Sequence, residues 1–228
     1  MTTQPSTPAP GARDGPVLID LDGTLVDTLG DIVATTNHLR TSFDLPAVAP
    51  AVARSWVGDG VVALMERALA DAGPFEPLRQ RAREIYFAHH WEACVVTAAP
   101  YPGAVAALAG WRAAERPLAV VTNKPRRFSE RILAHLELLP FFGALVCGDD
   151  LPEKKPSPAP LHEALRRLGA RPGLGVMVGD SIQDLRAARA AGLRSVAALY
   201  GFSDPAILRR EGADEFWAAF AVREESPG

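Results

Sequence analysis

The chain has 228 residues, of which 48% are hydrophobic and 22% are charged, and its formal net charge is −3. These values are typical of a folded soluble protein with one large domain, or one domain that carries an insertion. The small negative charge and the lack of a dense basic cluster argue against a nucleic-acid partner. No apolar run approaches the length of a membrane span, so no membrane partner is expected.

The two cysteines, Cys94 and Cys147, are too few for a disulfide framework and are not spaced as a metal site. The N-terminus lacks the charged and apolar regions of a signal peptide. These features predict a cytoplasmic protein. Residues 1–15, rich in Pro, Thr, Ser, Gly and Ala, are expected to be a disordered tail, and 223–228 a second short tail.

The first predicted strand, Val17-Leu18-Ile19, runs directly into Asp20-Leu21-Asp22-Gly23-Thr24-Leu25. Asp20 and Asp22 are two residues apart, a spacing that points both side chains to the same side of an extended chain. Two like charges so close need a cation, a proton or a lysine to neutralise them. One carboxylate could then be a nucleophile or metal ligand and the other an acid and base. The alternative is a simple turn, because Asp-Gly is a strong turn signal.

Residues 29–97 have a helical pattern throughout. Thr28 and Asp31 have capping-box spacing at the start of the first helix. The three helices are expected over 29–42, from Asp59-Gly60 to Gly73-Pro74, and from Pro77 towards Ala93. The sequence therefore predicts a helical cap domain over 29–97, inserted into a core made of 16–28 and 98–222.

From Pro102 onward, short helices alternate with apolar strands, which predicts right-handed crossovers and a parallel sheet. The fold class expected is α/β, with a Rossmann-like parallel core and the helical cap as an insertion. In such a sheet, ligands bind beyond the carboxyl ends of the strands. The expected strands are Leu118–Val121, Ala144–Cys147, Val176–Val178 and Ser195–Leu199, with helices near 104–114, 126–137, 158–168 and 182–191.

Three further polar segments follow these strands: Thr122-Asn123-Lys124, Lys154-Lys155-Pro156-Ser157-Pro158 and Gly179-Asp180-Ser181-Ile182-Gln183-Asp184. Ser157 and Pro158 resemble the N-cap and first position of a helix. Asp184 also fits a capping box with Ser181. An acid directly after a buried strand, as at Asp180, needs a partner. The chain has only three lysines, and all three lie in these segments.

Four of these acids, Asp20, Asp22, Asp180 and Asp184, would together form an acidic pocket suited to a hard cation, with Mg²⁺ favoured as the cofactor. Thr122 and Lys155 would add a hydrogen-bond donor and positive charge. Metal, lysine and backbone amides could neutralise a transferring phosphoryl group. The pattern therefore favours phosphoryl transfer, with a small phosphorylated metabolite as the partner.

These motifs resemble those of the haloacid dehalogenase superfamily of phosphohydrolases with a helical cap after the first strand. The resemblance implies that Asp20 attacks phosphorus and forms an aspartyl phosphate, while Asp22 acts as acid and then base. Thr122 would bind the phosphoryl group and Lys155 would hold the charges together. It also implies Mg²⁺ coordination by Asp20, the Asp22 carbonyl and Asp180, supported by Asp184. Phosphate contacts are expected from Gly23, Thr24, Asn123 and Lys124.

Within the superfamily, the chain is most similar to bacterial phosphoglycolate phosphatases, on segments that include Trp56-Val57-Gly58-Asp59-Gly60 and Gly148-Asp149-Asp150. This implies hydrolysis of 2-phosphoglycolate, for which Arg54 is the candidate cap contact. A phosphatase for another small ester, such as an amino-sugar phosphate, a sugar phosphate or a nucleotide, stays open, as does a sugar phosphomutase. His89-His90 is expected to have a packing or surface role. A monomer and a homodimer are both compatible with the sequence.

Overall fold

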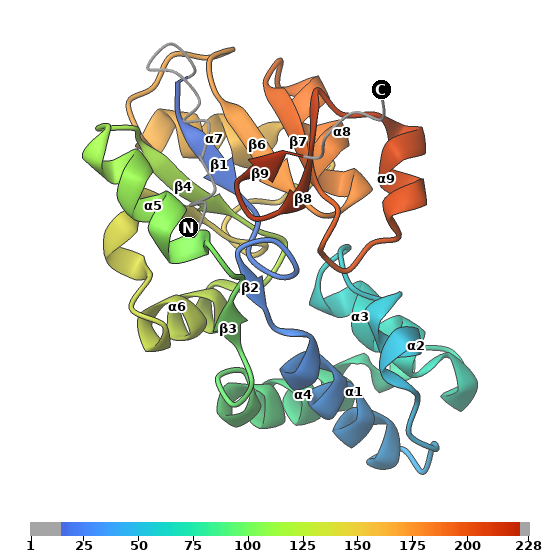
Figure 1. Cartoon of the computed structure of the whole chain (residues 1–228). Coiled ribbons are helices and arrows are strands. Elements are labelled where there is room, and N and C mark those ends of the chain that lie inside the picture. The colour runs from blue at the N-terminus through green and yellow to red at the C-terminus, as the bar shows by residue number, and fades with distance from the viewer. Residues whose placement is uncertain (1–14, 224–228) are drawn as a thin grey trace, which may run out of the picture.

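A computed structural model describes residues 15–223, and its centre is a sheet in the strand order β5-β4-β1-β6-β7-β8-β9 (Figure 1). Neighbouring strands from β5 to β8 pair in parallel, and β9 pairs antiparallel with β8. The strands are β1 Val17–Ile19, β4 Leu118–Val121, β5 Ala144–Val146, β6 Val176–Gly179, β7 Arg194–Ala198, β8 Glu215–Ala219 and β9 Val222–Arg223. Because β1 lies between β4 and β6, the residues after these three strands are neighbours.

Helices cover both faces of the sheet. Successive side chains of β1 point to opposite faces and pack against different helices. Val17 and Ile19 pack in one core cluster with residues of α5 (Ala104–Ala113) and α6 (Arg126–His135). Leu18 packs in the opposite cluster with residues of α7 (Ala159–Arg167) and α8 (Ile182–Ala190). Strands buried on both faces are apolar throughout, which is why they were recognisable as short continuous apolar runs.

The helical cap has a core of its own. It contains α1 Leu29–Thr41, α2 Pro50–Arg54, α3 Val61–Ala68 and α4 Arg79–Ala93, with 3-10 turns at Ala70–Ala72 and Glu76–Leu78. Buried side chains of α1, α3 and α4 form one cluster around Leu39, Met65 and Tyr86. Two antiparallel strands, β2 Val26–Asp27 and β3 Ala99–Pro100, join the cap to the sheet (Figure 1). The predicted fold class is confirmed.

Several short elements were missing from the sequence prediction. These are α2, the β2–β3 ribbon, α9 Pro205–Glu211, a 3-10 turn at Leu139–Phe141, β8 and β9. Strands of two residues leave no readable periodicity, which explains the omission of the ribbon. The helix expected after Asp59-Gly60 begins at Val61, and the one expected from Pro77 begins at Arg79. The helix after Ser157 begins at Ala159, whose N–H donates to the Ser157 hydroxyl at 3.2 Å.

The capping box expected from Thr28 and Asp31 is wrong. Thr28 stands at the N-cap of α1 without a capping bond, and its hydroxyl donates to Asp22 Oδ1 at 2.6 Å. Asp31 accepts from the N–H and hydroxyl of Thr97, at 2.8 and 2.6 Å, and from the N–H of Ala98 at 3.1 Å. Asp31 therefore joins the first cap helix to the segment that returns to the core.

Cys94 and Cys147 are both buried and unpaired. Within residues 15–223, no helix combines the length and apolar character needed to cross a membrane. The two predicted tails lie outside the described residues, apart from Gly15 and Arg223 at their inner ends.

Replacing Asp31 by Ala should lower the free energy of unfolding by about 2–4 kcal/mol, because buried N–H donors of Thr97 and Ala98 would lose their acceptor. Asp31→Asn should lose less, since the amide oxygen still accepts a hydrogen bond. Urea unfolding of both variants measures the difference. The matched control is Glu92→Ala, whose side chain is 79% exposed. A change below about 0.5 kcal/mol for Asp31→Ala would contradict the assigned role.

Candidate active site

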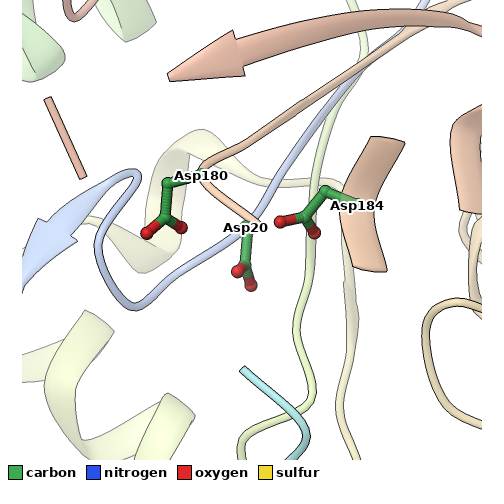
Figure 2. Close-up of side chains that lie close together, drawn as sticks. All are labelled: Asp20, Asp180 and Asp184. Carbon is green, nitrogen blue, oxygen red and sulfur yellow. The ribbon is translucent and has the colours of Figure 1, made fainter. Parts of the chain in front are cut away.

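Three aspartates come together at the carboxyl ends of the central strands. Asp20 follows β1, Asp180 follows β6, and Asp184 lies in the first turn of α8. One carboxylate oxygen of each lies within 4.8 Å of those of the other two, and all three residues are buried. Figure 2 shows the three carboxylates close together. The acids expected after two separate strands therefore form one cluster.

Lys155 lies inside this acidic cluster and is 4% exposed. Its Nζ lies 2.9 Å from Asp20 Oδ1 and 2.6 Å from Asp184 Oδ1, and it donates to the carbonyl of Val121 at the end of β4. Burial alone would lower the pKa of Lys155, but the charges of Asp184 and Asp20 raise it above its ordinary value. The ammonium therefore stays charged and neutralises part of the cluster.

The negative charge that remains is visible in the pKa values of two carboxyls. Burial raises the pKa of Asp20 to about 7, although the charge of Lys155 opposes the shift. Burial also raises the pKa of Asp180 to about 8, and the charges of Asp20 and Asp184 add to it. Three buried carboxylates beside one ammonium leave an excess of negative charge that a hard divalent cation would neutralise. The residues present therefore fit such a cation.

Asp184 supports the cluster and caps a helix. Its Oδ2 accepts from the N–H of Ser181 at 3.0 Å and from the Ser181 hydroxyl at 2.6 Å, while its Oδ1 faces Lys155. A side chain at Gly179 would place a Cβ 2.1 Å from the Asp184 Cγ, so this position tolerates only glycine. Both carboxylate oxygens of Asp184 thus have partners within the protein, one at the helix cap and the other at the Lys155 ammonium.

Asp180 is held by Thr24, which the sequence analysis assigned to phosphate, and by the backbone of Phe202. Its Oδ1 accepts from the Thr24 hydroxyl at 2.8 Å, and its Oδ2 accepts from the N–H of Phe202 at 2.6 Å. Gly23 has φ +78°, and a Cβ there would lie 2.4 Å from Asp180 Oδ2. Thr24 is fully buried, and neither it nor Gly23 is among the residues that line the cavity. Their contact with phosphate stays a prediction.

Asp22, which was expected to be the fourth acid of this cluster, is not part of it and has different partners. Its carboxylate lies 3.0 and 3.1 Å from the Nζ of Lys124, and it accepts from Thr28 at 2.6 Å. Lys124 is 8% exposed. The two neighbouring acids of the first motif are therefore neutralised by different lysines. The pairing of Lys124 with Asp22 was not expected from the sequence, although the scarcity of lysine had marked Lys124 as unusual.

Thr122 and Asn123 follow β4 and are both buried. The Thr122 hydroxyl accepts from the N–H of Lys124 at 3.2 Å. The Asn123 amide accepts from the N–H of Lys155 at 3.0 Å and donates to the Lys155 carbonyl at 2.9 Å. It also donates to the carbonyl of Gly58 in the cap, at 2.9 Å. Asn123 thus positions the lysine loop and the cap turn, and its side chain is fully engaged.

A cavity of about 580 Å³ lies between cap and core. Core residues that line it include Asp20, Asp22, Thr122, Lys124 and Asp180, and cap residues include Arg54, Gly58, Leu64, Tyr86 and His90. Arg54 bridges the two parts, because its guanidinium donates to the carbonyls of Gly201, at 2.7 Å, and Phe202. Among the described lining residues, Arg54 and Lys124 are the cations, and only Lys124 contacts a carboxylate.

Sequence reasoning missed several residues of this site. Thr28 was assigned to a helix cap, His90 to packing, and Tyr86 and Phe202 were not considered. Gln183 was quoted only as part of a motif, yet it donates to Asp59 of the cap turn. No local pattern shows these partners, since they lie far apart in the chain.

Comparisons with known proteins show the family to which the chain belongs. Residues 17–198 match the family model described as haloacid dehalogenase-like hydrolase. A phosphoglycolate phosphatase of Nitrosococcus oceani is 37% identical over 87% of this chain and 89% of its own length. One from Chromobacterium violaceum is 39% identical, with the same coverage.

The solved structures include a predicted phosphoglycolate phosphatase from Haemophilus somnus 129PT. It superimposes with a TM-score of 0.86, at 29% identity, over 92% of this chain and 96% of that chain. The family match covers most of the chain, from residue 17 to residue 198. The chain belongs to the haloacid dehalogenase-like hydrolases and is an enzyme of the phosphoglycolate phosphatase-like type, a phosphoric monoester hydrolase.

Proposed function

We propose that the enzyme hydrolyses 2-phosphoglycolate to glycolate and phosphate, with Mg²⁺ as cofactor and Asp20 as the nucleophile. The observation that carries this proposal is the position of Asp20. It lines the cavity, contacts Lys155 at 2.9 Å, and stands two residues before Asp22, which has a separate lysine partner. One carboxylate is thus placed for attack, and a second lies beside it for proton transfer.

Mg²⁺ would be held by Asp20, Asp180 and the Asp22 backbone carbonyl, and when bound it would neutralise charge on the phosphate oxygens. Asp184 and Lys155 would keep Asp20 and the surrounding charges in place. The raised pKa values of Asp20 and Asp180 support this assignment, because burial disfavours their charged forms and a bound cation would offset that cost.

In the first step, a carboxylate oxygen of Asp20 forms a bond to phosphorus, and the bond from phosphorus to the ester oxygen breaks. Asp22 gives a proton to the departing oxygen, which leaves as the alcohol. In the second step, water attacks the phosphorus of the aspartyl phosphate, and Asp22 takes a proton from that water. The bond to Asp20 then breaks, which releases phosphate and restores the Asp20 carboxylate.

Lys124 links phosphate binding to this proton transfer. In the structure its ammonium contacts both oxygens of Asp22. A bound phosphate offers the ammonium a second anion. Lys124 is therefore placed to contact a bound phosphate as well as the carboxylate that we assign to proton transfer.

The choice of 2-phosphoglycolate rests on the names of the relatives and on one cap residue. A carboxylate on the leaving group requires a positive partner in a buried site. Arg54 lines the cavity, and no carboxylate of a described residue forms an ion pair with it. It is therefore the side chain that we assign to the glycolate carboxylate.

The covalent step can be tested with p-nitrophenyl phosphate, whose leaving group needs no proton. Asp22→Asn should release about one equivalent of nitrophenol per enzyme and then stop, because hydrolysis of the aspartyl phosphate needs the missing base. Mass spectrometry should find the trapped phosphate. Asp20→Asn should give no burst and lose at least about a thousandfold in rate. The matched control is Asp44→Asn, an exposed position with φ +57° that Asn tolerates. A burst from Asp20→Asn would contradict the mechanism.

The acidic cluster predicts a characteristic dependence of stability on pH. In the unfolded chain Asp20 and Asp180 titrate near 3.8, but in the folded protein they titrate near 7 and 8, so the native state binds more protons between these values. Without metal, stability should therefore fall as pH rises from about 7 to 9. Added Mg²⁺, which needs ionised ligands, should raise Tm more at pH 9 than at pH 7.

Burial lowers the pKa of His90 well below 6.5, so below pH 6.5 its contribution to stability rises with pH. That contribution opposes the effect of the two acids, so the comparison is made at pH 7 and above. Thermal melts in EDTA and in excess Mg²⁺, at pH 7 and pH 9, give the four values required. Asp180→Asn should reduce the loss of Tm between pH 7 and pH 9 in EDTA. It should also reduce the increase in Tm that Mg²⁺ causes. An equal Mg²⁺ effect at both pH values would argue against metal binding by these carboxyls.

Replacing Arg54 by Ala should raise KM for 2-phosphoglycolate by about 10- to 100-fold, the value of a hydrogen bond to a charged group. The effect on ethyl phosphate, which has no carboxylate, should be smaller. Arg54→Lys should restore part of the affinity. Steady-state kinetics with both esters measure the split. Equal losses for the two esters would assign Arg54 to cap closure through Gly201 and Phe202.

A further inference from the structure

The cap wall of the cavity contains two polar side chains that the proposed mechanism does not use. Tyr86 and His90 lie one turn apart on α4, and their ring centroids are 5.2 Å apart. Both line the same cavity as Asp20 and Asp22. They are 3% and 1% exposed, respectively. Residues four apart share one face of a helix, so both side chains reach the cavity from the same wall.

Each of the two has a hydrogen-bonding group without a partner. The buried Nε2 of His90 has no hydrogen bond to any described residue. The Tyr86 hydroxyl likewise makes no hydrogen bond within residues 15–223. Buried polar groups are nearly always paired, and an unpaired one reduces stability. Such groups beside a cavity are explained by a ligand that supplies the missing hydrogen bonds.

The inner partner of His90 determines what its outer nitrogen can do. Nδ1 lies 3.0 Å from the Thr35 hydroxyl, which donates to the carbonyl of Asp31 at 2.9 Å. Because the one proton of that hydroxyl goes to the Asp31 carbonyl, we assign His90 the tautomer that donates from Nδ1 and carries a lone pair on Nε2. His89 Nδ1, 3.2 Å from the same hydroxyl, is assigned as a second donor to it. Burial lowers the pKa of His90 well below its ordinary value, so the ring is neutral. Burial also raises the pKa of Tyr86, so the phenol keeps its proton.

The pair therefore offers an acceptor, His90 Nε2, next to a donor and acceptor, the Tyr86 hydroxyl. An alcohol matches this arrangement, since it can donate to the imidazole and accept from the phenol. A carboxylate does not, because it has no proton to donate to Nε2. The wall is also without charge, which makes burial of an anion against it costly.

The position of the pair relative to the reaction also follows from the structure. The charge of Asp22 contributes to the pKa shift of Tyr86, and that of Lys124 contributes to the shift of His90. Lys124 contacts Asp22 at 3.0 Å, and Tyr86 and His90 line the same cavity as these two residues, which include the one that we assign as the acid for the leaving group. A volume of about 580 Å³ also leaves room for much more than a two-carbon acid, within the range of roughly 300–1,000 Å³ that holds drug-sized ligands.

We propose that Tyr86 and His90 form a subsite for an uncharged hydroxyl of the leaving group, and that the enzyme hydrolyses polyol and sugar phosphates besides 2-phosphoglycolate. This inference rests on the proposed phosphatase function. The phosphate would lie at Asp20, the leaving oxygen at Asp22, and a hydroxyl one or two carbons away would bridge His90 Nε2 and the Tyr86 hydroxyl. The residues act as specificity determinants and take no part in bond cleavage.

The test compares two esters of the same length, glycerol 3-phosphate and propyl phosphate, with 2-phosphoglycolate as the third substrate. The wild type should have a higher kcat/KM for glycerol 3-phosphate than for propyl phosphate. Tyr86→Phe should reduce that preference about 5- to 10-fold, mainly through KM, and leave propyl phosphate unchanged. Tm should not fall, since the hydroxyl has no partner within the described fold. Tyr101→Phe is the matched control, because Tyr101 packs on Tyr200 and is not among the cavity residues.

His90 provides a second pair of variants. His90→Asn keeps a polar atom near Thr35 but lacks the outer nitrogen, so it should lose the preference. His90→Gln places a polar atom near the position of Nε2 and should restore part of it. Circular dichroism and Tm establish that each variant is folded.

The outcomes separate this inference from the proposed function. If the wild type hydrolyses 2-phosphoglycolate but shows no preference for glycerol 3-phosphate over propyl phosphate, the proposed function stands and the subsite is refuted. Equal losses for all three esters in Tyr86→Phe also refute it. If the wild type releases phosphate from none of the esters with Mg²⁺, both proposals fail.

Discussion

The site depends on a single constraint, the neutralisation of buried carboxylates by Lys155. Asp20 and Asp184 are both buried, and each lies within 3 Å of its ammonium. Removing the lysine would leave these charges without a partner, which is among the most destabilising changes in a protein interior. The strand order explains how this contact forms: β4, β1 and β6 are adjacent, so the Val121 carbonyl, Asp20 and the start of α8 surround one point. The parallel topology is therefore a requirement of the charge arrangement.

The cap is connected to the same constraint. Asn123 holds the backbone of Lys155 on both sides and also donates to the carbonyl of Gly58 in the cap. Gln183, next to Asp184, donates to Asp59 in the same cap turn. A movement of the cap would break the contacts of Gly58 and Asp59 with the core, whereas the contacts of Lys155 with the acids lie within the core. The charge arrangement can thus persist while the cavity opens and closes, which suits an enzyme that must admit substrate and exclude water.

The sequence predicted features that depend on residues close together in the chain. It did not predict contacts between residues that are far apart in the chain. The strands around Leu18, Val120 and Met177 are buried on both faces, so continuous apolar runs identified them. Two acids, Asp20 and Asp180, directly follow strands, and Lys155 lies in the loop after another strand. Residues that follow the strands of a parallel sheet lie at the same edge, so the sequence could predict that these three would come together. Thr28 and Asp31 show the opposite case: their spacing is that of a capping box, yet each found a better partner elsewhere in the fold. Spacing cannot distinguish the two results, because the competing partners, Asp22 and Thr97, belong to other elements.

His90 shows the same limit at the level of function. In the sequence it is one of two adjacent histidines, and divergence around a helix made a packing role the natural interpretation. Part of that interpretation holds, since its ring packs against Phe128, with centroids 4.7 Å apart. The unpaired Nε2 becomes visible only when Thr35 fixes the inner nitrogen and the cavity defines the surroundings. The cavity is lined by a cation, Arg54, and by the uncharged pair Tyr86 and His90. Under the proposed mechanism the core acids would act on any phosphate ester, so the choice of alcohol would fall to Arg54 and to the Tyr86–His90 pair.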